Sequence, residues 1–169
     1  MRKFGIIAIT VFNFAFGQES VTPKVRSTIS IGERLEYKMY MGIFTVGKGS
    51  TTVDNNYFLK NEKPCYKVDA YMQTSGMATW ISKVNDNWGA YIDTSELVTH
   101  ESYRRLSEGK YRLHEVITYD HDRDEAMVTV ADKKTGKFGK PKRYSTPDKV
   151  RDVVAGFMYL RIIDFLSTN

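Results

Sequence analysis

The fold is decided by a short alternating stretch near the start of the chain, Arg34-Leu35-Glu36-Tyr37-Lys38-Met39-Tyr40-Met41. Apolar side chains at 35, 37, 39 and 41 alternate with charged ones at 34, 36 and 38, and successive residues of a strand point to opposite faces of a sheet. The stretch therefore predicts a half-buried strand. Gly42 turns the chain, and residues 43–53 predict the second strand of an antiparallel hairpin. Gly47 and Gly49 in this second strand indicate a bulge or closely packed backbone.

The same pattern recurs along most of the chain. Apolar residues alternate again at 66–72, and further short strands are predicted at 84–92, 99–106, 111–119 and 125–130, separated by polar turns. Residues 75–82 break the alternation and predict a short helix or an apolar crossing. Seven short strands joined by tight turns predict a mainly β (α+β) fold, with a curved, partial-barrel-like antiparallel sheet instead of a parallel α/β array.

The last element is different. Pro147 before Asp148 predicts a helix that runs from Asp148 to about Leu166 and packs against the sheet. The polar residues of this segment are scattered round the helix, so that no side of it is plainly polar. A helix that is apolar nearly all round is expected to be covered on more than one side, either by a wrapping sheet or by chain outside this sequence.

The N-terminus predicts export. Met1-Arg2-Lys3 precedes an apolar run from Phe4 to Phe16, and Ala15-Phe16-Gly17 supplies small residues at a cleavage site, as in a secretory signal peptide. The run is too short for a membrane-spanning helix. Residues 1–17 are thus predicted to be removed after Gly17. Gln18 then stands first where a bacterial lipoprotein needs Cys, which predicts a soluble periplasmic or extracellular protein.

The rest of the chain fits one domain. Residues 18–30 are polar and aperiodic and predict a flexible lead-in, and residues 31–169 predict a single β-rich domain. The formal charge of +5 falls by two when Arg2 and Lys3 are removed, which gives no reason to expect a nucleic-acid partner. Six basic residues between Lys133 and Arg143 are interpreted as a solvated hairpin loop, with an anionic surface as the alternative.

The residues that usually carry chemistry form no recognisable motif. Cys65 is the only cysteine, so no disulfide can form within the chain, and a buried thiol is expected. The acidic run from Asp120 to Glu125 lacks the spacing of a calcium loop and predicts a polar hairpin turn. His100, His114 and His121 have no zinc-like spacing and are expected at the surface or at strand edges. No catalytic residue, metal site or cofactor is predicted, and the chain is not expected to be an enzyme.

Aromatic side chains around the short irregular crossing form the remaining candidate site. Trp80, Trp88, Tyr91 and Tyr103 could line an apolar cavity, and ordinary core packing is the alternative. Trp80 beside Ile81 favours the core, whereas Trp88 in Asn87-Trp88-Gly89 favours exposure. With two residues of the predicted helix, the candidate ligand-binding set is Trp80, Trp88, Tyr91, Tyr103, Phe157 and Arg161.

Several short segments of the sequence occur in the order and at the spacing found in one protein family. They are Ile31-Gly32-Glu33-Arg34-Leu35-Glu36-Tyr37, Ile43-Phe44-Thr45-Val46-Gly47, Thr74-Ser75-Gly76, Val84-Asn85-Asp86, Tyr91-Ile92-Asp93, Tyr103-Arg104-Arg105 and Tyr159-Leu160-Arg161. In this order and spacing the chain resembles the bacterial envelope family catalogued as domain of unknown function 3108, especially as found in Bacteroidota. The similarity covers nearly all of residues 31–165.

The resemblance implies an exported, mostly β protein without an established activity, and it supplies no catalytic residues. It also implies kinship with curved-sheet carriers that hold lipid or acyl chains under a helix. Members of the family typically continue for several strands beyond the helix, so the resemblance identifies this chain as the N-terminal portion of the family domain, either truncated or shortened.

Two functions follow as expectations. The first is a non-catalytic envelope protein that binds a lipid or another apolar ligand between a curved sheet and a helix. The alternative is a protein-protein interaction or envelope assembly module that docks a partner, or a second copy, through residues 148–166.

Overall fold

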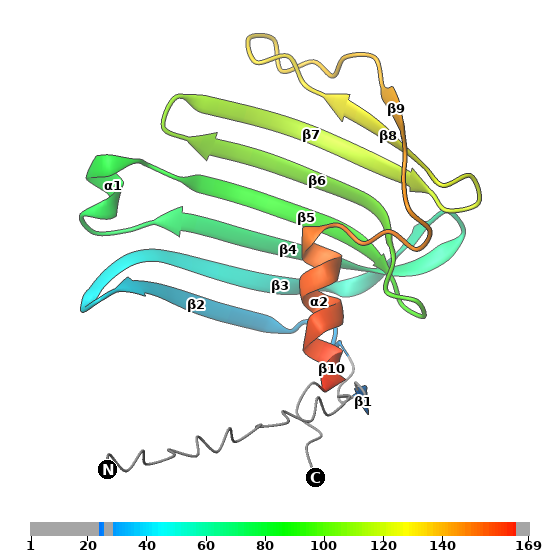
Figure 1. Cartoon of the computed structure of the whole chain (residues 1–169), viewed down its shortest axis with the longest axis horizontal. Coiled ribbons are helices and arrows are strands. Elements are labelled where there is room, and N and C mark those ends of the chain that lie inside the picture. Colours follow the sequence, from blue (N-terminus) through cyan, green and yellow to red (C-terminus); the bar gives the residue numbers. More distant parts are fainter. Residues whose placement is uncertain (1–23, 26–28, 165–169) are drawn as a thin grey trace, which may run out of the picture.

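A computed structural model describes residues 24–25 and 29–164, and the predicted signal peptide lies outside the described residues. Most of the described chain forms one antiparallel sheet, in which each strand pairs with the next along the sequence (Figure 1). In sheet order the strands are β2 (Arg34–Met41), β3 (Phe44–Lys60), β4 (Lys63–Thr74), β5 (Asn85–Asp93), β6 (Thr99–Glu108), β7 (Tyr111–Asp120), β8 (Glu125–Val130) and β9 (Lys142–Ser145).

The sheet is curved and does not close, which confirms the predicted fold class. Its register shifts between Met39 and Tyr40 of β2, again between Val53 and Tyr57 of β3, and between Tyr91 and Ile92 of β5. Such bulges bend a strand and increase its twist. The close approach predicted at Gly49 is also present, because a Cβ there would lie 3.1 Å from the carbonyl oxygen of Tyr71.

The sequence misses the last strand of the sheet. β9 falls partly within the segment interpreted as a basic loop, and all four of its residues are exposed. A strand that buries no face carries no alternation of apolar residues, so it leaves no periodic signal. It is placed by pairing with β8, where Ala126 faces Tyr144. The remaining basic residues lie in the connection between β8 and β9, as predicted.

The predicted C-terminal helix is confirmed, but its predicted bounds are wrong: residues 148–152 precede it, and Ile163 and Asp164, predicted to be helical, form strand β10. α2 spans Val153–Ile162, and residues 148–152 form a connection in which Lys149 has a positive φ of 51°. Asp152 caps the helix, because its Oδ1 accepts the backbone N–H of Ala155 at 2.9 Å. The helix therefore begins directly after its capping residue, at Val153, five residues later than the predicted start at Asp148.

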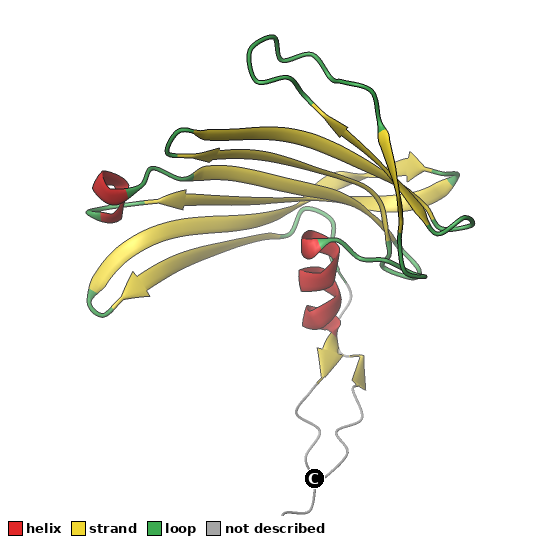
Figure 2. Ribbon diagram, turned by 45° about the horizontal axis from the view of Figure 1, so that its top comes forward, coloured by secondary structure: helices red, strands yellow, loops and turns green. Residues whose placement is uncertain are grey.

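α2 packs on the centre of the sheet and crosses its strands steeply (Figure 2). We call the face of the sheet that it covers the helix face and the opposite one the open face. Val154, Ala155 and Met158 point into the core formed with β3, β4, β5 and neighbouring segments. The sheet contributes Val53, Val68, Ala90 and Ile92, and the segments beside it contribute Ile29 and Leu97.

Within the described chain the sheet covers α2 on one side only, so the first alternative, a sheet that wraps the helix, is wrong, and cover by chain outside this sequence stays a prediction. Val153, Phe157 and Leu160 are 66%, 42% and 55% exposed. Within the described chain, the outer side of the helix is therefore apolar and in contact with solvent.

The remaining elements are short. α1 (Ala78–Ile81) is a single helical turn between β4 and β5, where the sequence predicts a short helix. β1 (Lys24–Val25), within the predicted lead-in, pairs with β10 (Ile163–Asp164), which directly follows α2. These two strands form a separate ladder beyond the end of the helix (Figure 1).

Truncation of the helix side chain at the centre of the core tests this packing. Met158 is fully buried, so Met158→Ala is expected to lower the free energy of unfolding by about 2–5 kcal/mol in urea titrations. Leu160→Ala, on the exposed side of the same helix, is the matched control and is expected to change it by less than about 0.5 kcal/mol. Equal effects of the two substitutions would contradict the orientation of α2.

Candidate functional site

An apolar hollow of about 400 Å³ lies on the helix face, between the sheet and α2. The strands supply its floor and one wall, and the first two turns of α2 supply the other wall. The apolar side chains that line it are Tyr37, Met39, Ala70, Met72, Trp88, Val153, Val154 and Phe157, the polar ones are Thr51 and Asp86, and Gly49, Ser50 and Tyr71 also border it.

Much of this apolar lining is in contact with solvent. Met72 and Phe157 are each 42% exposed, and the rings of Tyr37 and Phe157 meet edge to face with centroids 6.2 Å apart. Large apolar side chains that face each other across a hollow without filling it leave a surface that an apolar molecule can cover.

A second hollow of about 310 Å³ adjoins the first, because Trp88 and Val153 line both. We call the two together the groove. The second hollow is more polar: Arg104, Glu115, Arg151 and Asp152 line it with Ser102, Tyr103, Ile117 and Tyr119. The groove is therefore apolar at one end and charged at the other.

The charged groups of the second hollow differ in how far they are neutralised. Arg104 Nε donates to Glu115 Oε1 at 2.7 Å, and Asp152 is used as the helix cap. Arg151 donates to the carbonyl oxygen of Glu96 at 2.8 Å, and its guanidinium carbon lies 4.1 Å from the centroid of the Tyr159 ring. Among the described residues, no carboxylate forms an ion pair with Arg151, so its guanidinium is a cation at this end of the groove without a charged partner.

Two buried polar atoms border the apolar hollow without a partner in the described part of the chain: Trp88 Nε1 and Asp86 Oδ2. The other carboxylate oxygen of Asp86 accepts the backbone N–H of Ser107 at 2.8 Å. Desolvation first, and the neighbouring Asp86 carboxylate second, raise the pKa of Glu108. The Trp88 indole N–H is the unpartnered hydrogen-bond donor at the border of this hollow.

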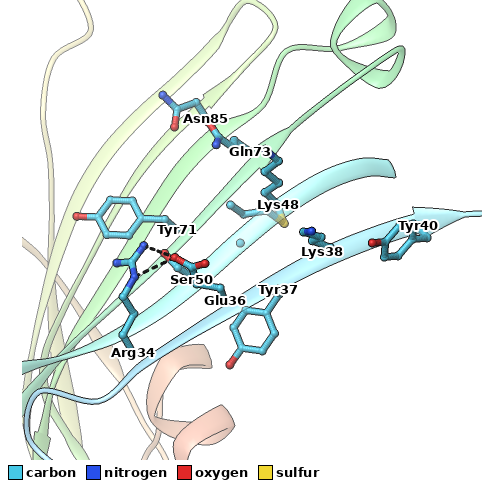
Figure 3. Close-up of a pocket in the computed structure, with 12 residues that line it drawn as sticks. Arg34, Glu36, Tyr37, Lys38, Tyr40, Lys48, Ser50, Tyr71, Gln73 and Asn85 are labelled. Carbon is cyan, nitrogen blue, oxygen red and sulfur yellow. Dashed lines mark hydrogen bonds and ion pairs between the residues drawn. The ribbon is translucent and has the colours of Figure 1, made fainter. Parts of the chain in front are cut away.

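A larger hollow of about 840 Å³ lies over β2, β3 and β4, and its lining is mostly polar (Figure 3). Arg34 donates to Glu36 Oε1 from Nε at 3.1 Å and from Nη2 at 3.0 Å. Lys38, Lys48, Gln73 and Asn85 also line it. These groups are exposed and either paired or solvated, so the hollow lacks the desolvated polar groups that mark a reactive site.

The structure brings together two of the six predicted site residues. Trp88 and Phe157 line the same apolar hollow. The two tryptophans are buried in the reverse of the expected order. Trp88 is partly buried against the core, whereas Trp80 on α1 is 90% exposed. The expectation that Trp80 is a core residue is therefore wrong, and Trp80 lies outside the groove.

The other three predicted residues point elsewhere. The Tyr103 hydroxyl donates to Asp69 Oδ1 at 2.5 Å, and its ring fills the space that a side chain at Gly89 would need. Asp69, Gly89 and Tyr103 are register partners on β4, β5 and β6, so this row lies on the open face, although Tyr103 also borders the second hollow. The Tyr91 ring packs against Phe58 and under the Lys60 ammonium group.

Arg161 forms an ion pair with Glu33 and contacts Met158 Sδ at 3.3 Å. This pair ties the last turn of α2 to the residue before β2 and does not line the groove.

Sequence reasoning misses most of the groove wall. Tyr37 and Met39 share a face with Leu35 in the first predicted strand, and Ala70 and Met72 share a face in the third. Alternation places each pair on one face, but only the register of β2, β3 and β4 shows that the two faces coincide. Arg151 is missed because the sequence predicts that the segment containing it is part of the helix.

Cys65 and the acidic run behave as expected. Cys65 is a buried free thiol, and burial first, then the charge of Asp93, raise its pKa to about 11. It therefore remains protonated at neutral pH.

The acidic run forms the β7–β8 turn, in which Asp120 Oδ1 accepts the N–H groups of Asp122 and Arg123. Among the described residues, no three His, Cys, Asp or Glu side chains come together in a way that could hold a metal ion.

The expectation that the histidines are surface residues is wrong for His100, which is 7% exposed. Its ring meets that of His121 edge to face at 5.2 Å, and its Nε2 lies 3.5 Å from Asp93 Oδ2. Asn61 Nδ2 lies 3.2 Å from its Nδ1. Burial lowers the pKa of His100, and this outweighs the opposing effect of Asp93. The pair comes from β6 and from the turn after β7, so no local spacing reveals it.

The family model described as "Protein of unknown function (DUF3108)" matches residues 36–167. No curated protein and no solved structure matches the chain. Across residues 24–25 and 29–164, none of the helices has the length and apolar character needed to cross a membrane.

The buried histidine predicts a pH dependence of stability. The pKa of His100 is lower in the folded chain than its usual value of about 6.5, so the unfolded chain binds more protons below that pH and stability falls as the pH decreases. The free energy of unfolding in urea is expected to be lower at about pH 5.5 than at about pH 7.5.

His100→Gln is expected to flatten this dependence, whatever its effect on absolute stability. His114→Gln is the control, because His114 is less buried and its pKa is lowered in the same direction by burial and then by Arg105. If the control flattened the dependence as much as His100→Gln does, the effect could not be assigned to the buried ring.

Proposed function

The chain belongs to the DUF3108 family of proteins of unknown function, and we propose that it is an exported, non-catalytic binding protein whose groove holds an apolar or amphipathic ligand between the sheet and α2. One observation carries the proposal: the apolar hollow is built from side chains of four strands and one helix, and it is open to solvent.

The size of the groove agrees with a small-molecule site. Pockets for small molecules usually have volumes of about 300–1,000 Å³, lined mainly by apolar side chains with a few polar groups. The apolar hollow of about 400 Å³ falls in this range, and the adjoining hollow of about 310 Å³ supplies the polar groups. Burial of Met72, Val153 and Phe157 under a ligand would remove apolar surface from water, which stabilises the complex.

The two ends of the groove suggest an amphiphile with an anionic head group. The apolar part of such a ligand would lie against Tyr37, Met72 and Phe157, and the head group would lie near Arg151. Arginine binds carboxylates and phosphates through two parallel hydrogen bonds, and Arg151 has no carboxylate partner among the described residues. The Trp88 N–H is a further donor at the junction of the two hollows.

Export is part of the proposal and is supported by the sequence. The charged start, the apolar run and the small residues before Gln18 fit a cleaved signal peptide, and the periplasm or the extracellular space is the compartment that this implies. A free, buried Cys65 agrees with a fold that does not depend on a disulfide.

A second function is favoured by the exposed side of α2. Val153, Phe157 and Leu160 present an apolar stripe that a partner protein or a second copy could cover. Light scattering separates self-association through this stripe from ligand binding in the groove. A protein that stays monomeric at all concentrations and binds an amphiphile supports ligand binding and not self-association.

Filling the apolar hollow tests the proposal. The full chain is expected to bind a fluorescent fatty acid such as cis-parinaric acid, and Ala70→Trp is expected to weaken binding about tenfold or more because the ring occupies the hollow. Leu160→Trp adds the same ring outside the hollow and is expected to leave the affinity unchanged. Absence of probe binding, together with no lipid in native mass spectra of the purified protein, would overturn the proposal.

The charged end is tested separately with Arg151→Gln. This substitution is expected to weaken binding of the fatty acid about tenfold or more, because a hydrogen bond to a charged group contributes about 1.5–3 kcal/mol. Binding of the uncharged methyl ester of the same acid is expected to stay the same. Arg143→Gln, on exposed β9, is the control. An equal loss for acid and ester would mean that Arg151 shapes the groove without binding a head group.

A further inference from the structure

Six large apolar side chains are exposed together at one end of the sheet. Two segments supply them: the β2–β3 turn and the segment that carries α1, which lie at the same end in Figure 1. Ile43, Trp80 and Ile81 are 89%, 90% and 88% exposed. We call this surface the tip, and its members are Met41, Ile43, Phe44, Met77, Trp80 and Ile81.

The two segments of the tip are held to each other by the backbone. The N–H of Ser75 donates to the carbonyl oxygen of Val46 at 3.0 Å, and a Cβ at Gly76 would lie 3.0 Å from the carbonyl oxygen of Thr45. Within α1, the N–H of Ser82 donates to the carbonyl oxygen of Ala78. These backbone contacts fix the two segments relative to each other, so their apolar side chains are displayed as one surface.

Basic side chains lie at the same end of the sheet. Lys38 and Lys48 face each other across β2 and β3, Lys110 and Arg112 lie at the β6–β7 turn, and Lys83 lies two residues after α1. The β6–β7 turn is joined to the α1 segment, since the N–H of Gly109 donates to the carbonyl oxygen of Lys83 at 2.9 Å. Glu108 is the acidic side chain at this turn, and its pKa is raised.

The other end of the sheet has turns of mixed charge. The turns there are β3–β4, β5–β6 and β7–β8, together with the connection that leads to α2. Their acidic residues are Glu62, Asp93, Glu96, Asp120, Asp122, Asp124 and Asp148, and their basic residues are Lys63, Arg123, Lys149 and Arg151. Arg123 pairs with Asp120, and Lys149 pairs with Glu96. The five basic residues named above, which we call the collar, therefore lie at the end of the sheet that carries the apolar tip.

We propose that the tip inserts into the interfacial layer of a lipid bilayer that carries anionic head groups. Tryptophan is favoured at the boundary between head groups and acyl chains, and aliphatic side chains beside it reach into the apolar layer. Lysines around such a patch keep their ammonium groups among the head groups, and each basic residue near an anionic surface strengthens binding. The charge of the collar selects an anionic bilayer over a neutral one.

This proposal does not depend on the groove. The tip shares no residue with the apolar hollow or with the charged hollow beside it. A variant that fills the hollow, Ala70→Trp, is therefore expected to bind vesicles as the unsubstituted chain does, so failure of one proposal leaves the other open to test.

Sedimentation with vesicles tests the tip. The full chain is expected to sediment with vesicles of phosphatidylglycerol and phosphatidylethanolamine, and at least about tenfold less with pure phosphatidylcholine. Trp80→Ser and Ile81→Ser are each expected to reduce binding about tenfold or more, because each removes a large side chain from the apolar layer. Leu59→Ser is the matched control, since Leu59 is 72% exposed at the opposite end of β3.

Fluorescence locates the contact even if another part of the chain also binds vesicles. The sequence has two tryptophans, so a blue shift on addition of anionic vesicles is expected in the unsubstituted chain and is expected to be lost in Trp80→Phe. Lys83→Glu with Lys110→Glu is expected to weaken binding to anionic vesicles. The proposal is overturned if Trp80→Phe retains the shift, or if Leu59→Ser loses as much binding as Ile81→Ser.

Discussion

The helix α2, with ten residues, is too small to cover the face of the eight-stranded sheet on which it packs, and this difference in size governs the rest of the structure. α2 is about 15 Å long at 1.5 Å per residue, whereas eight strands at about 4.8 Å spacing span roughly 34 Å. The helix therefore seals only the centre of the face, over β4 and β5. On one side of it β6 and β7 present charged groups such as Arg104 and Glu115, and on the other side Tyr37 and Met72 stay apolar and exposed. The groove lies where the charged part and the apolar part of this face meet beside α2.

The groove keeps its shape because the start of α2 is fixed to the sheet. Thr99 Oγ1 donates to Asp152 Oδ1 at 3.0 Å and accepts the N–H of Asp152 at 3.0 Å, while the same carboxylate caps the helix at Ala155. Burial raises the pKa of Asp152, and these hydrogen bonds oppose the shift. At the other end Arg161 pairs with Glu33. A helix tied at both ends cannot slide across the strands without breaking buried polar contacts, so the distance between Phe157 and the sheet is set in advance.

The sequence predicts the part of this arrangement that depends on local pattern. Alternation at 35–41 and 66–72 is enough to find strands, and their antiparallel order follows from the short turns. Pairing across strands is not local: Trp88 is drawn inward because it shares a face with Ala90 beneath α2, whereas Trp80 lies on a single turn that packs on no core. The start of α2 is equally non-local, since Pro147 offers a first position but Thr99, far away in sequence, binds the carboxylate that caps the helix.

The strands at the two edges of the sheet bear on the meaning of the exposed tip. Unpaired edges invite association with other chains, and proteins protect them with charged side chains. β2 carries Arg34 and Lys38, and β9, the other edge of the described sheet, carries Lys142 and Arg143. The edges are thus charged, while the turns at one end expose Ile43, Trp80 and Ile81 almost completely. A chain that carries charged side chains on both edge strands and exposes its largest apolar side chains at one end, beside several basic residues, has the surface expected of a protein that meets a bilayer end-on.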